Sequence, residues 1–172
     1  MILPVIKYGS PILRKFSYDI HEEDLPEQVS KNMFDTLKKD AGIGLAGPQI
    51  GLLKKIFIID TTPLLEDDPL IKKVEQLFVN PKILEVSDDQ VIYNEGCLSI
   101  PGIYKDLYRP AKIRVRYQDL SFNTIEEELD GMPARIFQHE YDHLEGILFI
   151  DKLSALQRKL ISGKLNKIRK QK

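Results

Sequence analysis

Apolar residues recur at helical spacing near the start of the chain. Val29, Met33 and Leu37 are four residues apart and therefore share one face of a helix. The segment Asp24-Leu25-Pro26-Glu27 precedes them and offers an N-cap residue, a glutamate three residues later and a proline in the first turn. The pattern predicts a helix that begins at Asp24 and ends near Asp40-Ala41-Gly42, where glycine permits a sharp exit.

The pattern then changes from helical to extended. The segment from Gly42 to Gly51 contains four glycines and a proline, and it predicts a tight, irregular loop. Thr61 to Glu75 is acidic and contains prolines, which predicts an exposed loop. Runs rich in β-branched and aromatic residues predict strands. These runs are Ile56 to Ile59, Leu77 to Val79, Ile83 to Val86, Val91 to Tyr93, Ile113 to Tyr117 and Thr124 to Leu129.

Two later segments return to helical spacing. Pro133 opens a helix that continues to about Leu144 and ends before Gly146. Its apolar stripe consists of Ile136, Phe137, Tyr141 and Leu144. Ser154-Ala155-Leu156-Gln157 has the form of a capping box and starts a C-terminal helix. The apolar residues of that helix, roughly on one side, are Leu156, Leu160, Leu165 and Ile168.

The order of these segments is helix, then strands, then helices, which is typical of an α+β fold. We expect mixed, mainly antiparallel strands around the central helix from Pro133, with a further helix at the C-terminus. With 172 residues, 42% hydrophobic and 30% charged, the chain should form a single domain over residues 1–172.

The sequence shows no sign of export or membrane insertion. The N-terminus lacks the basic and apolar segments of a secretory signal, and no run approaches the roughly 20 apolar residues that span a bilayer. Cys97 is the one cysteine, so no internal disulfide can form, which fits a reducing cytoplasm.

Charge is distributed unevenly along the chain. Residues 152–172, which we expect to form a basic C-terminal helix, hold eight of the 25 basic residues and none of the 26 acidic ones. This asymmetry indicates that the C-terminal helix contacts a polyanion. The alternative is an ordinary solvated helix face.

Two of the three histidines lie in Gln138-His139-Glu140-Tyr141-Asp142-His143. Residues four apart lie on one helical face, about 6 Å apart along the axis, so both imidazoles can reach one metal ion with Glu140 beside them. The alternative is a pair of surface histidines with a solvated glutamate. The predicted helix and its apolar stripe favour the metal site.

A catalytic metal typically has three protein ligands and a position open to water, so one more ligand is needed. The candidates are His21, Cys97 or a carboxylate. Cys97 follows a predicted strand and Gly96, which lets the backbone approach closely. Its alternative role is that of a small buried hydrophobe. His21 lies in a polar segment and is expected at the surface.

Three motifs together resemble the peptide deformylase family, hydrolases that remove the N-formyl group from new polypeptides. They occur in the family's order and are Gly42-Ile43-Gly44-Leu45-Ala46-Gly47-Pro48-Gln49, Glu95-Gly96-Cys97-Leu98-Ser99 and Gln138-His139-Glu140-Tyr141-Asp142-His143-Leu144. The resemblance extends from Pro11 to the basic C-terminal segment. Gly47 departs from it, because the family usually has alanine there; a smaller residue should fit and could loosen the loop.

The resemblance implies that Cys97 joins His139 and His143 as the third metal ligand. Such a site suits Zn²⁺ or Fe²⁺, and affinity order alone does not decide which ion is bound in a cell. The resemblance favours one Fe²⁺ ion, which Zn²⁺, Ni²⁺ or Co²⁺ could replace in purified protein.

The resemblance also implies that Glu140 is the acid/base and that Gln49 and the Leu98 N–H contact the formyl oxygen. Attack of water on a formamide carbonyl builds negative charge on that oxygen, which needs donors and a metal nearby. Glu140 can take the water proton and hand it to the departing amine. The alternative for Gln49 is a loop residue that bonds its own backbone.

By the same resemblance, Gly44 and Gly96 border the substrate cleft, and Ile43 helps to line a pocket for a methionine-like side chain. The alternative for both glycines is an ordinary turn. The expected reaction converts an N-formyl-methionyl peptide and water into formate and a free N-terminal methionyl peptide.

Two other classes of protein stay open. Zinc endopeptidases share the H-E-x-x-H pattern, but they usually add a carboxylate or a third histidine rather than a cysteine. A ribosome-associated binding module with a structural metal would fit the basic C-terminal segment, but a structural site needs a fourth protein ligand.

The expected partners are nascent N-formylmethionyl peptides and, through the C-terminal helix, the ribosome; no membrane or DNA partner is expected. We expect a bacterial cytoplasmic location, because formylated starts belong to bacteria and organelles and no transit peptide is visible.

Overall fold

The computed structural model describes residues 1–24 and 28–170. The helices of this part of the chain are α1 (Val29–Lys39), α2 (Gly131–Leu144) and α3 (Ala155–Lys170). Its strands are β1 (Gly44–Ala46), β2 (Ile56–Asp60), β3 (Glu75–Val86), β4 (Gln90–Cys97), β5 (Ile100–Pro110), β6 (Lys112–Gln118) and β7 (Thr124–Asp130). The predicted α+β class is confirmed. None of the described helices combines the length and the apolar character needed to cross a membrane.

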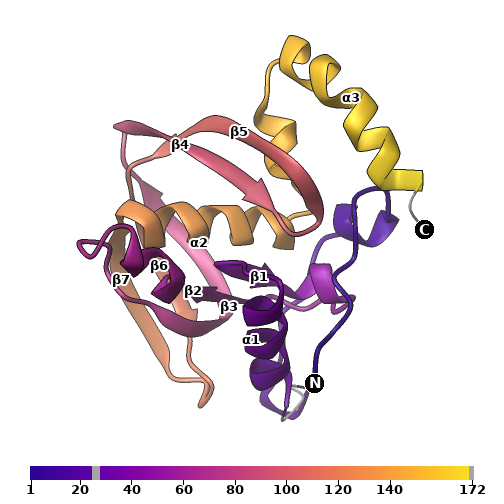
Figure 1. The fold of residues 1–172 in the computed structure, drawn as a ribbon. Coiled ribbons are helices and arrows are strands. Elements are labelled where there is room, and N and C mark those ends of the chain that lie inside the picture. The colour runs from indigo at the N-terminus through magenta and orange to yellow at the C-terminus, as the bar shows by residue number, and fades with distance from the viewer. Residues whose placement is uncertain (25–27, 171–172) are drawn as a thin grey trace.

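The strands form two antiparallel layers with α2 between them. Five strands make a sheet in the order β1-β2-β3-β6-β7, and β4 pairs with β5 as a separate hairpin. Figure 1 shows α2 lying between the hairpin and the sheet, with α1 on the opposite face of the sheet. Every residue of β2 is buried, because Phe57 and Ile59 face α2 while Ile56 and Ile58 face α1.

An aromatic cluster fixes α2 on the sheet. Phe137 meets Phe57 and Phe78 edge to face, with ring centroids 4.9 and 5.2 Å apart. Phe78 also meets Tyr117 of β6 at 4.7 Å. Each such pair adds about 0.5–1.5 kcal/mol beyond the burial of area. Because the hairpin covers the other side, every residue of α2 from Pro133 to Glu140 is buried.

α3 packs against β5 and the N-terminal segment. Its buried residues Ile161, Leu165 and Ile168 have the spacing of one helical face and join an apolar cluster with those elements. The predicted apolar side was wrong for Leu156 and Leu160, which are 67% and 72% exposed. The helix turns Ile161 inward in their place.

The predicted capping box at the start of α3 is confirmed. The Gln157 N–H donates to Ser154 Oγ at 3.2 Å, and the Ser154 N–H donates to Gln157 Oε1 at 3.1 Å. Both N–H groups would otherwise lack a helical partner. The predicted helical span of 152–172 is narrower in the structure, since Lys152 ends a 3₁₀ turn before α3 begins. Residues 171–172 lie outside the described chain.

The start of α1 differs from the prediction, whereas its end, with Asp40 as C-cap, lies where it was expected. Its N-cap is Gln28, and Asp24 instead ends a short 3₁₀ turn. Residues 25–27, with the predicted proline and glutamate, lie outside the described residues. At the other end Ala41, rather than Gly42, adopts the left-handed φ of +52°. Gly42 lets the Leu37 side chain pack closely, because a Cβ there would lie 2.6 Å from Leu37 Cδ1 and the leucine would have to shift.

Two strands were not predicted. β1 lies within the segment assigned to an irregular loop, and it is a strand because β2 supplies its hydrogen-bond partners. Near its start β5 contains Pro101 and Gly102, which are typical of turns. Its buried positions nevertheless alternate through Ile103, Leu107 and Arg109. The pairing with β4, rather than local propensity, therefore determines this strand.

Two further element boundaries differ from the prediction. The runs Leu77 to Val79 and Ile83 to Val86 belong to the single strand β3, whose pairing with β6 is irregular after Val79. There Asn80 has a φ of +46°, and its side chain bonds the backbone N–H and carbonyl of Ile20. α2 begins at Gly131, so Pro133 is its third residue and not its first.

Two glycine-to-alanine substitutions should change stability in opposite directions. Gly146 follows α2 with a φ of +71°, and a Cβ there would lie 2.7 Å from the Arg14 carbonyl oxygen. Gly146→Ala should lower the free energy of unfolding by about 1–3 kcal/mol. A Cβ on Gly163 in α3 would meet open space. Gly163→Ala should therefore raise the free energy of unfolding by about 0.5–1 kcal/mol. Urea unfolding measures both, and a stabilised Gly146→Ala would contradict the assigned constraint.

Candidate active site

Two residues of β4 face the two histidines of α2. His139 and His143 are one helical turn apart, about 6 Å along the axis. Glu95 and Cys97 are two residues apart in β4, about 6.6 Å along the strand. Because these spacings match, Glu95 Oε1 lies 2.9 Å from His139 Nδ1 while Cys97 Sγ lies 3.3 Å from His143 Nε2.

Cys97, His139 and His143 form a candidate metal site. One ligand atom of each lies within 4.8 Å of the others. Both histidines are buried and the cysteine is half-buried. Since Glu95 engages Nδ1 of His139, Nε2 is the atom left for a metal, as in sites where a carboxylate orients the imidazole ligand. The sulfur and two imidazoles therefore fit a divalent ion such as Zn²⁺ or Fe²⁺.

Hydrogen bonds from three side chains surround the buried carboxylate of Glu95. Arg109 donates from Nε at 2.7 Å and from Nη2 at 2.9 Å, Arg135 donates at 2.6 Å, and His139 supplies the remaining contact. Burial opposes ionisation, but the hydrogen bonds from His139 and Arg109 hold the pKa of Glu95 well below its usual range. Arg109 also donates to Asp142 of α2 at 2.8 Å. These ion pairs tie β4, β5 and α2 together behind the candidate metal site.

Glu140 points from α2 toward the same site. Its side chain is buried, and burial raises the pKa of its carboxyl to about 7. Its Oε2 has no hydrogen-bond partner within the described part of the chain. The Gly44 backbone approaches so closely that a Cβ there would overlap Glu140 Oε1. A carboxyl that titrates near neutral pH is suited to accept and release a proton, and a cation bound beside it would favour its charged form.

The orientation of the Gln49 side chain is fixed by the backbone. Its Oε1 accepts the Ala46 N–H at 2.8 Å, so its NH₂ group faces Ser99 Oγ at 3.1 Å and Cys97 Sγ at 3.5 Å. Gln49 bonds its own loop, which was the alternative role considered for it, and it also presents an amide donor beside the cysteine. Such a donor can stabilise negative charge on an oxygen at this position.

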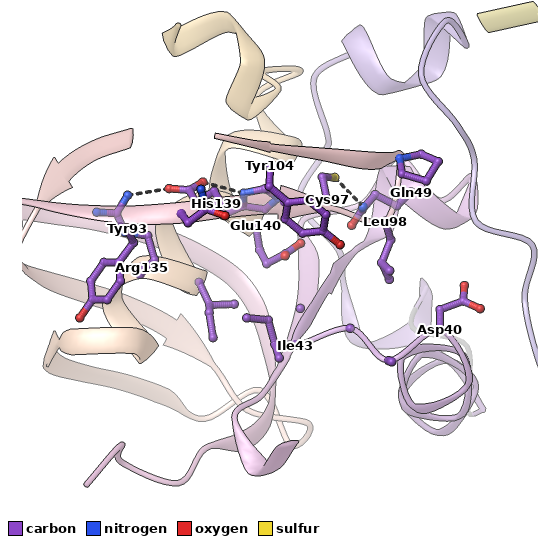
Figure 2. A pocket seen from close by; sticks show the side chains of 18 of the residues that line it. Asp40, Ile43, Gln49, Tyr93, Cys97, Leu98, Tyr104, Arg135, His139 and Glu140 are labelled. Atoms are coloured by element: carbon purple, nitrogen blue, oxygen red, sulfur yellow. Dashed lines mark hydrogen bonds and ion pairs between the residues drawn. The ribbon is translucent and has the colours of Figure 1, made fainter. Parts of the chain in front are cut away.

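These groups surround a pocket of about 530 Å³. Most residues expected at the site line it: Ile43, Gly44, Gln49, Gly96, Cys97, Leu98, His139 and Glu140. His143 lies behind this wall and is 1% exposed. Figure 2 shows His139 and Glu140 in the middle of the pocket, with Gln49 and Leu98 at one end and Tyr93 and Arg135 at the other. His21 is exposed, as expected.

Two further glycines of the motifs allow close contacts. The Tyr104 ring of β5 lies where a Cβ on Gly96 would be. A Cβ on Gly47 would lie 2.6 Å from the Leu52 carbonyl oxygen and 2.8 Å from that of Lys54. Gly47 therefore leaves no loose space in its loop, because neighbouring backbone fills it.

Several residues that hold the ligands were not predicted from the sequence. Glu95 belongs to a motif but had no assigned role, and Arg109 and Asp142 were not singled out. One signal existed for Arg109, which follows Ile103 and Leu107 at the inward positions of β5. Because β5 itself was not predicted, nothing marked this charge as buried.

Comparison with known proteins supports the family resemblance that the three motifs indicated. The model of the polypeptide deformylase family matches residues 2–159. A peptide deformylase of Cytophaga hutchinsonii is 47% identical over 99% of this chain and 92% of its own. One from Christiangramia forsetii is 42% identical over 99% and 91%, respectively.

Solved structures agree with these matches. A plant peptide deformylase superimposes with a TM-score of 0.85 at 37% identity, over 96% of this chain and 88% of its own. The peptide deformylase of Ehrlichia chaffeensis gives a TM-score of 0.86 at 31% identity, over 97% and 96%. With the three motifs gathered at one pocket, the chain belongs to the polypeptide deformylase family.

Proposed function

We propose that this protein removes the formyl group from the N-terminal formylmethionine of newly made polypeptides and releases formate. One observation carries the proposal: a Cys-His-His cluster, a buried glutamate and an oriented amide donor meet at one pocket. The named family relatives support the same reaction. Formate release from a formyl-methionyl peptide whose internal peptide bonds stay intact tests it against an endopeptidase.

In this proposal Cys97, His139 and His143 hold one divalent ion, which we propose to be Fe²⁺ in the cell. Such an ion lowers the pKa of a coordinated water and polarises a carbonyl oxygen. The chain's own contribution is to hold the donors in place, since Glu95 fixes the His139 ring and β4 carries Cys97 to the same side of α2.

Glu140 handles the proton in the proposed reaction. Its carboxylate takes the proton of the attacking water and delivers it to the nitrogen of the departing methionine. As the carbonyl carbon becomes tetrahedral, negative charge develops on the formyl oxygen. Gln49 and Leu98 both line the pocket, and the Gln49 amide and the Leu98 N–H are proposed to donate hydrogen bonds to that oxygen.

The rest of the pocket is proposed to bind the formyl-methionyl residue. Ile43 supplies apolar surface for the methionine side chain, while Gly44 and Gly96 let the peptide backbone approach. Glycine at position 44 also keeps the space that the Glu140 carboxyl fills. We propose that residues 1–172 act as one catalytic domain in a bacterial cytoplasm.

The basic face of α3 is proposed to contact ribosomal RNA. The helix turns its buried face, which includes Leu165 and Ile168, toward the body. Its exposed basic residues are Arg158, Lys159, Lys164, Lys167 and Arg169. Binding there would place the pocket near emerging chains, and contacts with phosphates depend on salt.

Cys97→Ala should reduce the metal content of the purified protein to about a tenth or less, because two histidines alone are an incomplete catalytic metal site. Metal analysis of protein purified without oxygen measures this and also identifies the bound ion. His21→Ala is the matched control, since this exposed histidine lies outside the cluster. Full metal content in Cys97→Ala would remove Cys97 from the ligand set.

Glu140→Gln should keep its metal but release formate roughly 10² to 10⁴ times more slowly, because an amide keeps the shape and cannot carry the proton. The control is Glu145→Gln, at the end of the same helix and away from the pocket wall. Wild-type turnover by metal-loaded Glu140→Gln would assign proton transfer to another residue.

Neutralising α3 should weaken ribosome binding without affecting hydrolysis of a short peptide. Removing α3 would expose the cluster that it covers, so the better variant combines Lys159→Gln, Lys164→Gln and Lys167→Gln. Its ribosome affinity should depend less on salt, by up to about one unit of logarithmic slope per lysine. The control variant combines Lys39→Gln, Lys73→Gln and Lys82→Gln, which remove the same number of positive charges elsewhere on the surface. Equal ribosome affinity of the two triple variants would refute docking through α3.

A further inference from the structure

Three consecutive residues of the N-terminal segment bond to the two turns that carry the proposed oxygen-binding donors. The Ile6 N–H donates to the carbonyl of Gln49 and the Tyr8 N–H donates to the carbonyl of Ser99, each at 2.8 Å. Between them, Lys7 Nζ donates to the carbonyl of Leu98 at 2.8 Å. Residues 6–8 therefore clasp two turns that are about fifty residues apart in the sequence, one after β1 and one between β4 and β5.

Lys7 holds a distinct place in this clasp. The bonds of Ile6 and Tyr8 are made by the backbone, whereas Lys7 uses its side chain and also lines the pocket. By bonding the Leu98 carbonyl, it restrains the backbone orientation of the residue whose N–H is proposed to bind the formyl oxygen. Its ammonium group also brings positive charge to the end of the pocket where Gln49 lies.

The clasp is supported from behind by α3. The side chain of Arg169 packs so closely on Gly9 that a Cβ there would overlap it. Ile6, Tyr8 and the neighbouring apolar residues of the segment pack against the cluster that contains Ile161 and Leu165. The segment is thus pressed between the C-terminal helix and the two turns, which limits its freedom to move away from them.

We propose that Lys7 is a positioning residue that sets the Leu98 turn, and with it the oxygen-binding donors, for the reaction. This inference rests on the deformylase function proposed above. A donor misplaced by a fraction of an ångström costs more in the transition state than in the bound substrate, because the full charge on oxygen exists only in the former. Loss of Lys7 should therefore lower kcat rather than raise KM.

The test compares Lys7→Met, Lys7→Arg and Lys15→Met with the parent enzyme, using a short formyl-methionyl peptide. Methionine keeps the apolar stem without the donor, arginine keeps both donor and charge, and Lys15 is an exposed lysine nearby that does not line the pocket. Lys7→Met should lower kcat roughly three- to tenfold, the worth of one hydrogen bond, with KM within twofold and metal content unchanged. Lys7→Arg should recover most of the loss, and Lys15→Met should match the parent.

Other results would overturn the assignment. A rise in KM at constant kcat would make Lys7 a substrate contact, and a fall in thermal stability at constant kcat would make it a structural residue only. Equal loss in Lys7→Arg and Lys7→Met would exclude the hydrogen bond as the cause. Failure of the underlying function is separately visible, because then the parent enzyme itself would release no formate.

Discussion

The buried carboxylate of Glu95 is the constraint on which the site depends. An ionised carboxylate inside a protein must be paired and fully hydrogen-bonded. Two arginines and one histidine meet that requirement here, and they come from β5 and α2 while Glu95 comes from β4. Removing one partner of such a pair typically costs about 3–5 kcal/mol. The hairpin, the central helix and the orientation of His139 are therefore specified together.

A match between helix and strand geometry follows from this constraint. Once Glu95 faces His139, the next residue on the same side of the strand faces the next turn of the helix, which brings Cys97 to His143. The two strand residues and the two histidines are thus aligned, because the repeat distances of strand and helix are nearly equal. The aromatic contacts of Phe137 fix the opposite side of α2 on the sheet, so the helix cannot rotate without breaking both interfaces.

Local patterns in the sequence were sufficient for the central helix, its histidines, Glu140 and the capping box of α3. These features depend on residues within a turn or two of one another, so spacing alone predicts them. β1 and β5 could not be found in this way, because their partners are distant in sequence and their glycines and prolines resemble loop residues. The same holds for the charged residues Arg109 and Lys7, because their hydrogen-bond partners are distant in sequence and meet them only in the folded chain.

The position of α3 has a consequence for when the enzyme becomes complete during its own synthesis. Residues 6–8 are translated first, and the two turns that they bond are translated next. α3 is translated after every other described element. Until it emerges, the apolar side of the N-terminal segment and of β5 lacks the cover that Ile161, Leu165 and Ile168 provide. Because translation adds roughly 5–20 residues per second, the synthesis of α3 takes on the order of seconds. The rest of the fold can form during this time. Maturation of the active site then follows the folding of the central helix, because α3 comes later in the chain than α2.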